Sequence, residues 1–147
     1  MFFEQFNVGD RFQLPDIELT EEEIYNFASA FDPQLIHMDS EYAKRGLFRG
    51  VIASGFHTLC LVWKEWICLN RFGEENICGI GMDYVKWPSP VRAGDKISTI
   101  VEVTEAIPGN NCRRGMIAIK FTATNQNGNV VLLTTGRAFL KSARCKQ

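Results

Sequence analysis

The sequence predicts a mixed α+β fold in which one long apolar helix is covered by an antiparallel sheet. Three observations lead to this class: a capped amphipathic helix near the N-terminus, an apolar helix in the middle, and four strand-like segments in the second half. With 147 residues, 46% of them hydrophobic, the chain is long enough to bury one core without crosslinks. We therefore expect a single domain over residues 1–147.

A capping box predicts where the first helix begins. Thr20 is placed to accept a hydrogen bond from an N–H of the first turn, while Glu23 reaches back to the cap. Pro33 disfavours helical geometry at Asp32, so the helix should end there. Apolar residues at helical spacing should form one buried stripe: Ile24, Phe27, Ala28 and Phe31.

A short second helix is expected over residues 41–45. Ser40 is placed to cap it, and Gly46 to end it in a left-handed conformation. Asp39 either orients the preceding loop or helps Ser40 to start the helix, and we favour the capping role. His37 should then lie in an irregular stretch between the two helices.

The central helix is predicted to run from about Gly55 to Phe72, with Gly73 as its stop. Its apolar residues occupy most of the circumference, so it should be buried on nearly every side. They are Phe56, Leu59, Cys60, Val62, Trp63, Trp66, Ile67 and Leu69.

The second half of the chain has the pattern of long strands. Alternation of apolar and polar residues is clearest around residues 97–103 and 117–123. Turn-forming residues at 108–111 and 125–129 should join the last three strands as antiparallel hairpins. The four expected strands are 77–87, 96–107, 113–125 and 130–141.

Composition argues against several classes of function. The formal net charge of -1 gives no basic surface for nucleic acid, and no apolar run reaches the roughly 20 residues of a membrane span. The N-terminus lacks the pattern of a signal peptide, so we expect a cytoplasmic protein. The five cysteines have neither metal-binding nor disulfide spacing, and we expect reduced, mostly buried thiols and no metal.

The segment 31–39 carries the best candidates for chemistry, Asp32 and His37. If the chain curls after Pro33, the carboxylate and the imidazole can hold one water between them. Such a pair can take a proton from water and return one to carbon near neutral pH. An Asp-Pro break and a loop histidine also occur for structural reasons alone, so residue chemistry leaves both interpretations open.

Ser54 and Gly55 stand at the start of the central helix. Glycine permits close approach of a ligand, and the free N–H groups at a helix start present partial positive charge to an oxygen such as that of a thioester. The alternative is that Ser54 caps the helix and Gly55 permits tight packing. Both interpretations can hold at once.

Weaker candidates lie nearby. His57, inside the apolar helix, is more typical of a hydrogen-bonded core residue, and we leave it out of the catalytic set. Four cations suit the phosphates of coenzyme A, but no spacing singles one out: Arg45, Arg49, Lys86 and Arg92.

The string FDPQLIHMD, followed by GLFRGVIASGFHT, resembles the MaoC-like acyl dehydratase family, which includes the (R)-specific enoyl-CoA hydratases of the hot-dog fold. The similarity runs over nearly the whole chain, through NVGD, GMDYVKWPSPVRAGDKI and TGRAFLK. It implies a hot-dog fold, with a long central helix wrapped by a curved antiparallel sheet, and a homodimer or higher homo-oligomer.

The resemblance also implies an activity. Asp32 and His37 would activate the water that adds to a trans-2-enoyl-CoA to give an (R)-3-hydroxyacyl-CoA, or act in reverse, with the Gly55 amide binding the thioester oxygen. Coenzyme A would enter only as part of the substrate, without another cofactor. Where the family often has Gly-Asp-x-Asn-Pro, this chain has Phe31-Asp32-Pro33-Gln34, which leaves the acyl group open. Two alternatives remain: a hot-dog acyl-CoA thioesterase and a non-catalytic acyl-binding subunit.

Overall fold

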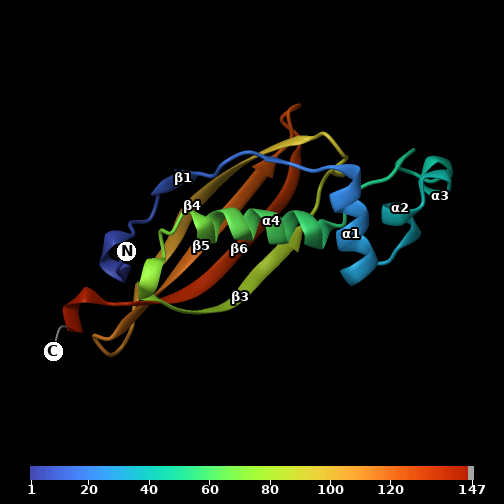
Figure 1. Cartoon of the computed structure of the whole chain (residues 1–147). Coiled ribbons are helices and arrows are strands. Elements are labelled where there is room, and N and C mark those ends of the chain that lie inside the picture. The colour runs from blue at the N-terminus through green and yellow to red at the C-terminus, as the bar shows by residue number, and fades with distance from the viewer. Residues whose placement is uncertain (146–147) are drawn as a thin grey trace.

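The computed structural model describes residues 1–145 and has the predicted mixed α+β architecture. Figure 1 shows a curved antiparallel sheet packed along helix α4 (Gly55–Cys68), with the three other α-helices gathered at one end of the molecule. Those helices are α1 (Glu21–Phe31), α2 (Leu35–Met38) and α3 (Ser40–Arg45). Single 3-10 turns lie at Phe3–Gln5, Gly73–Glu75 and Ala143–Cys145.

The sheet is antiparallel throughout, in the order β1-β4-β5-β6-β3, with β2 also paired to β4. The expected hairpins β4-β5 and β5-β6 are confirmed. The two short N-terminal strands were not predicted, because two or three residues are too few to show alternation. The strands are β1 (Arg11–Gln13), β2 (Ile17–Glu18), β3 (Asn76–Lys86), β4 (Lys96–Pro108), β5 (Arg114–Thr124) and β6 (Val130–Lys141).

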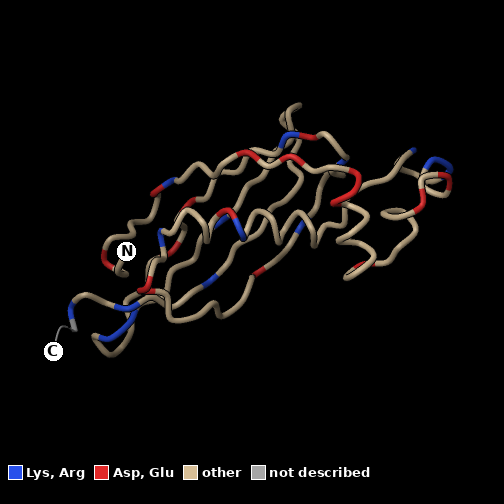
Figure 2. The backbone as a smooth tube through the Cα atoms, in the orientation of Figure 1, with Lys and Arg blue, Asp and Glu red and all other residues tan. Residues whose placement is uncertain are grey.

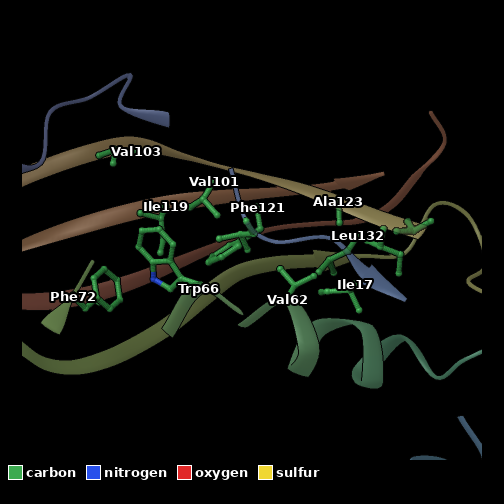
Figure 3. Packing of buried hydrophobic residues seen from close by; sticks show 14 of the residues in the cluster. Ile17, Val62, Trp66, Phe72, Val101, Val103, Ile119, Phe121, Ala123 and Leu132 are labelled. Carbon is green, nitrogen blue, oxygen red and sulfur yellow. The ribbon is translucent and has the colours of Figure 1, made fainter. Parts of the chain in front are cut away.

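The core lies between α4 and the inner face of the sheet (Figure 3). Trp66 is 1% exposed and meets Phe72 and Phe121 edge to face, with ring centroids 5.1 and 6.2 Å apart. Val62 is buried one turn earlier on the same side of α4. The sheet contributes buried residues from three strands: Val101, Val103, Ile117, Ile119, Phe121, Ala123, Leu132, Ala138 and Leu140.

Helix α1 begins as predicted, but it buries fewer of its apolar side chains than expected. The Thr20 amide donates to Glu23 Oε2 at 2.8 Å and the Glu23 amide donates to Thr20 Oγ1 at 3.2 Å, which completes the capping box. Ile24 and Ala28 are buried, whereas Phe31 is 76% exposed. The predicted stripe is therefore wrong at its last turn, because α1 lies beside the first turns of α4 rather than across the sheet (Figure 1).

The short helices differ from expectation in three details. His37 lies on a helical turn, α2, rather than in an irregular stretch. Asp39, not Ser40, caps α3, since its Oδ1 accepts from the Tyr42 amide at 2.8 Å. Gly46 has an extended backbone (φ -84°), and the left-handed residue is Arg49 (φ 58°).

Helix α4 ends at Cys68, before the predicted stop, and the backbone turns left-handed at Asn70 (φ 55°). One side of the helix is exposed, with Phe56 at 57% and Ile67 at 43%, so burial on nearly every side was a wrong prediction. The helix has a sheet on one side only in this chain.

The four cysteines with described side chains are reduced as predicted, but the prediction that they are mostly buried was wrong. Four thiols are free and exposed, two of them on the open side of α4 and one on β3; Cys145 has no described side chain. They are Cys60, Cys68, Cys78 and Cys112. Along the backbone, Lys and Arg are interspersed with Asp and Glu (Figure 2). Within residues 1–145, no helix is long and apolar enough to cross a membrane.

Trp66 provides a test of the core. Trp66→Ala should lower the free energy of unfolding by about 3 to 5 kcal/mol, since it leaves a cavity beneath the sheet. Trp66→Phe should cost less, because a ring remains and because the indole N–H, which has no acceptor among the described residues, is removed. Urea unfolding followed by circular dichroism measures both. Equal losses for the two variants would contradict this description of the core.

Candidate active site

Asp32 is held at the end of α1 with both carboxylate oxygens bonded. Its amide donates to the Ala28 carbonyl at 2.9 Å, which closes the helix. The Ser54 hydroxyl donates to Oδ2 at 2.6 Å, and Gln34 Nε2 donates to Oδ1 at 2.7 Å. The side chain is 16% exposed. The carboxylate is therefore fixed in direction yet still reachable.

His37 is buried beside this carboxylate. Its Nδ1 lies 2.7 Å from the Ile52 carbonyl oxygen, and its Nε2 lies 3.3 Å from Asp32 Oδ2. Because a carbonyl oxygen can only accept, the proton of the neutral imidazole is on Nδ1. Nε2 is then an acceptor directed at the carboxylate.

This geometry suits the binding of one water. In neutral His37, Nε2 and Asp32 Oδ2 are both acceptors and stand 3.3 Å apart. Two acceptors so close are stabilised when a water donates a hydrogen bond to each, or when a proton lies between them. The same two atoms can therefore hold a water and receive its proton.

The pKa of Asp32 is lowered below its usual range. The hydrogen bond from Ser54 is the main cause and that from Gln34 the next, while burial acts in the opposite direction and His37 adds a smaller lowering. The carboxylate is consequently ionised at neutral pH. It is an acceptor for a water proton in that state.

Ser54 and Gly55 have different roles in the local structure. Ser54 is buried, and its side chain makes no capping bond to α4, since its hydroxyl is bonded to Asp32. The capping alternative for Ser54 is therefore wrong. The Gly55 N–H stands at the first position of α4 and has no protein acceptor among residues 1–145.

Gly55 also permits tight packing. A Cβ at this residue would lie 2.5 Å from two ring carbons of Trp87, which no side chain tolerates without a shift. Gly55 therefore combines two features: its Cα packs tightly against Trp87, and its N–H remains free within the described part of the chain.

An apolar cavity of about 330 Å³ joins His37 and Gly55. Asp32 and Ser54 do not line it. Asp32 is connected to the cavity through its contact with His37, which does line it. A cavity with so many apolar walls suits a hydrocarbon chain. The remaining walls are Ile36, Phe48, Ile52, Ala53, Thr58, Trp87, Pro88, Ser89, Pro90, Val91 and Val131.

A second cavity, of about 440 Å³, also includes His37 and is more polar. Arg49 and Arg92 line it, whereas the other two candidate cations, Arg45 and Lys86, do not. Arg92 donates to the Phe48 carbonyl and so ties down the segment that precedes the site.

Other residues give a mixed result. His57 is buried in the core as expected and stacks on Phe27 with centroids 4.5 Å apart, and burial lowers its pKa. Its Nδ1, however, has no partner among the described residues, so the expected hydrogen bond is missing. Within residues 1–145, no group of three His, Cys, Asp or Glu side chains is placed to hold a metal.

Sequence reasoning missed two contacts of Asp32, those with Gln34 and Ser54. The Gln34 contact had a local signal, because a side chain two residues after an aspartate can reach back across a turn. The bond from Ser54 joins residues 22 apart in sequence. No spacing rule anticipates such a contact.

Comparisons with known proteins identify the family of this chain. A family model described as MaoC like domain matches residues 4–125. YdeM of Bacillus subtilis is 35% identical over 126 residues, covering 86% of this chain and 89% of YdeM. The 3-hydroxyacyl-thioester dehydratase Z of Mycobacterium tuberculosis is 35% identical over 83 residues, 55% of each protein.

Among solved structures, a MaoC-like dehydratase from Rhodospirillum rubrum aligns with a TM-score of 0.85 and 31% identity, covering 97% of each chain. The expected hot-dog arrangement, an apolar helix wrapped by an antiparallel sheet, is thereby confirmed. Because the family model spans most of the chain and the fold is shared throughout, this protein belongs to the MaoC-like dehydratase family.

Proposed function

We propose that the protein is a cytoplasmic, homodimeric acyl-thioester hydratase or dehydratase. It adds water to a trans-2-enoyl-CoA to give an (R)-3-hydroxyacyl-CoA, or catalyses the reverse reaction. Its family and its similarity to a 3-hydroxyacyl-thioester dehydratase support this class of reaction. The observation that carries the proposal is the pair of facing acceptors, Asp32 Oδ2 and His37 Nε2, since the histidine of this pair lines an apolar cavity.

In hydration, Asp32 and His37 act as one proton-handling unit. The water held between them attacks the β carbon, so that an O–C bond forms while the carbon–carbon π bond breaks and one water proton passes to the pair. The π electrons move toward the thioester carbonyl. The pair then returns a proton to the α carbon, which completes the addition of H and OH.

The Gly55 amide supplies the charge stabilisation in this proposal. As water attacks, the thioester oxygen gains negative charge, and an N–H at a helix start can donate to it without reorganisation. Gly55 and His37 line the same cavity, and in this proposal the acyl chain lies along its apolar walls. No metal or additional cofactor takes part in this scheme.

Asp32→Asn and His37→Gln test the catalytic pair. Asp32→Asn keeps the shape of the side chain but removes the carboxylate base, and His37→Gln removes the imidazole, so kcat for crotonyl-CoA should fall by about 10² to 10⁴ in each variant. The double variant should be scarcely worse than the more damaging single one, because the two groups serve one proton transfer. Loss of absorbance of the enoyl thioester measures the rate, and thermal unfolding checks the fold.

Asp16→Asn is the matched control, since Asp16 is exposed and its carboxylate pairs with Lys96, outside the site. It should retain the native rate. If Asp32→Asn hydrates every accepted enoyl-CoA at a near-native rate, the catalytic assignment is wrong. Release of free coenzyme A from saturated acyl-CoA would instead favour the thioesterase alternative.

Ser54→Ala should raise the pKa of Asp32, because it removes the bond that lowers it most. Gln34→Ala should raise the pKa less. Since the native pKa is depressed, the stability that ionised Asp32 contributes is present above its unfolded pKa and is lost as the pH falls through the folded pKa. Both variants should move that loss to higher pH, with Ser54→Ala moving it further. Carboxyl ¹³C NMR titration of Asp32 measures the shift; an unchanged pKa in Ser54→Ala would refute the cause.

The exposed edge strand β3 provides a test of the proposed homodimer. This strand ends the sheet, and its apolar residues Ile77, Ile80 and Met82 are 45%, 46% and 39% exposed, which is typical of an edge that a second copy covers. Light scattering should therefore give a mass well above the 16.7 kDa of one chain. Ile80→Lys should weaken association, whereas Ile100→Lys, an equally exposed isoleucine on β4, should not. A purely monomeric native protein at micromolar concentration would rule out the dimer.

A further inference from the structure

The indole ring of Trp87 lies directly against the Cα of Gly55. A Cβ built on Gly55 would stand 2.5 Å from two carbons of the ring and 2.8 Å from its nitrogen. The ring also meets Phe56 edge to face, with centroids 5.2 Å apart. It is thus packed on the first turn of α4, beside the free N–H of Gly55.

The backbone around Trp87 limits how far the ring can move. Trp87 follows the last residue of β3, and prolines occupy positions 88 and 90, where each fixes its own φ. The Ala53 amide donates to the Val91 carbonyl at 2.8 Å, which ties this segment to the chain that leads into α4. The ring is therefore held from both sides of the site.

Trp87 forms part of the wall between the apolar cavity and the outside. It lines the 330 Å³ cavity together with His37 and Gly55, and it is 41% exposed. Its neighbour Phe56 is 57% exposed. Two exposed aromatic rings therefore stand together at this end of the cavity.

We propose that Trp87 is a specificity-determining residue, which excludes acyl groups that carry a branch on C2, next to the thioester carbonyl. This inference rests on the proposed function, in which the carbonyl oxygen accepts from the Gly55 N–H. C2 is bonded to the carbonyl carbon, so it lies within one bond of the group that sits beside the indole ring. A methyl group on C2 must occupy space next to the carbonyl, where the ring already fills the volume above Gly55 Cα.

The magnitude of the selection follows from the size of one methyl group. Discrimination of a single methylene in an apolar pocket amounts to about 10- to 200-fold in kcat/KM. The native protein should therefore prefer crotonyl-CoA over its 2-methyl derivative, trans-2-methyl-2-butenoyl-CoA, by about tenfold or more. Trp87→Ala should reduce this ratio by about tenfold, and Trp87→Phe by less, because a smaller ring remains.

Phe12→Ala provides the matched control. Phe12 packs on Trp66 with centroids 5.5 Å apart and does not line the cavity, so its removal should affect stability and leave the substrate ratio unchanged. A ratio that changes in Trp87→Ala but not in Phe12→Ala separates selection from general loosening of the fold.

A size exchange tests the contact itself. Gly55→Ala should destabilise the protein by placing a Cβ inside the ring, and the double variant Gly55→Ala/Trp87→Ala should recover part of that loss in urea unfolding. Strictly additive losses would show that the ring yields freely and does not form a fixed wall.

Binding measurements keep this inference separate from the proposed function. Isothermal titration with butyryl-CoA and 2-methylbutyryl-CoA, which cannot be hydrated, should show the same preference in the native protein and its reduction in Trp87→Ala. If the native protein hydrates no enoyl-CoA but this binding preference is found, the proposed reaction is wrong and the proposed role of Trp87 in specificity is retained. If Trp87→Ala leaves both the rate ratio and the affinity ratio unchanged, Trp87 does not determine specificity.

Discussion

Burial of one side of α4 beneath the sheet is the constraint on which the site depends. Val62 and Trp66 fix the helix against three strands, so the position of its first turn is determined by packing two turns further along. Gly55 is the first residue of that turn, and Ser54 immediately precedes it. Asp32 and His37 are then located relative to it, through the Ser54 hydroxyl and the Ile52 carbonyl. A core of ordinary hydrophobic contacts thus sets the geometry of polar groups at its end.

The polar groups of the site are linked by hydrogen bonds, each of which orients either the carboxylate of Asp32 or the imidazole of His37. Ser54 and Gln34 use their donors on the carboxylate, the Ile52 carbonyl uses its acceptor on the imidazole, and one Nε2 lone pair with one carboxylate face remains for a ligand. Such an arrangement is largely paid for during folding, so little reorganisation is left for the moment of reaction. The adjoining cavity is largely apolar, and electrostatic interactions are stronger in such surroundings than in bulk water.

Much of the fold could be predicted because its signals are local. The Thr20–Glu23 box involves residues three apart, and the hairpins follow from turn residues between alternating strands. The errors arose where distant parts of the chain decide. Phe31 has the spacing of a buried residue but is 76% exposed. Ser54 has the chemistry of a cap, but a carboxylate 22 residues away accepts from its hydroxyl. Proximity of Asp32 and His37 was predictable; the donors that orient them were not.

Ile52 shows how selectivity and chemistry can change independently in such a site. The residue lines the apolar cavity, and its main-chain carbonyl fixes the proton on His37 Nδ1. Every amino acid has that carbonyl, so substitution at residue 52 can reshape the cavity without removing the group that sets the tautomer. Evolutionary change at residue 52 can therefore alter the shape of the cavity while the proton of the imidazole stays on Nδ1.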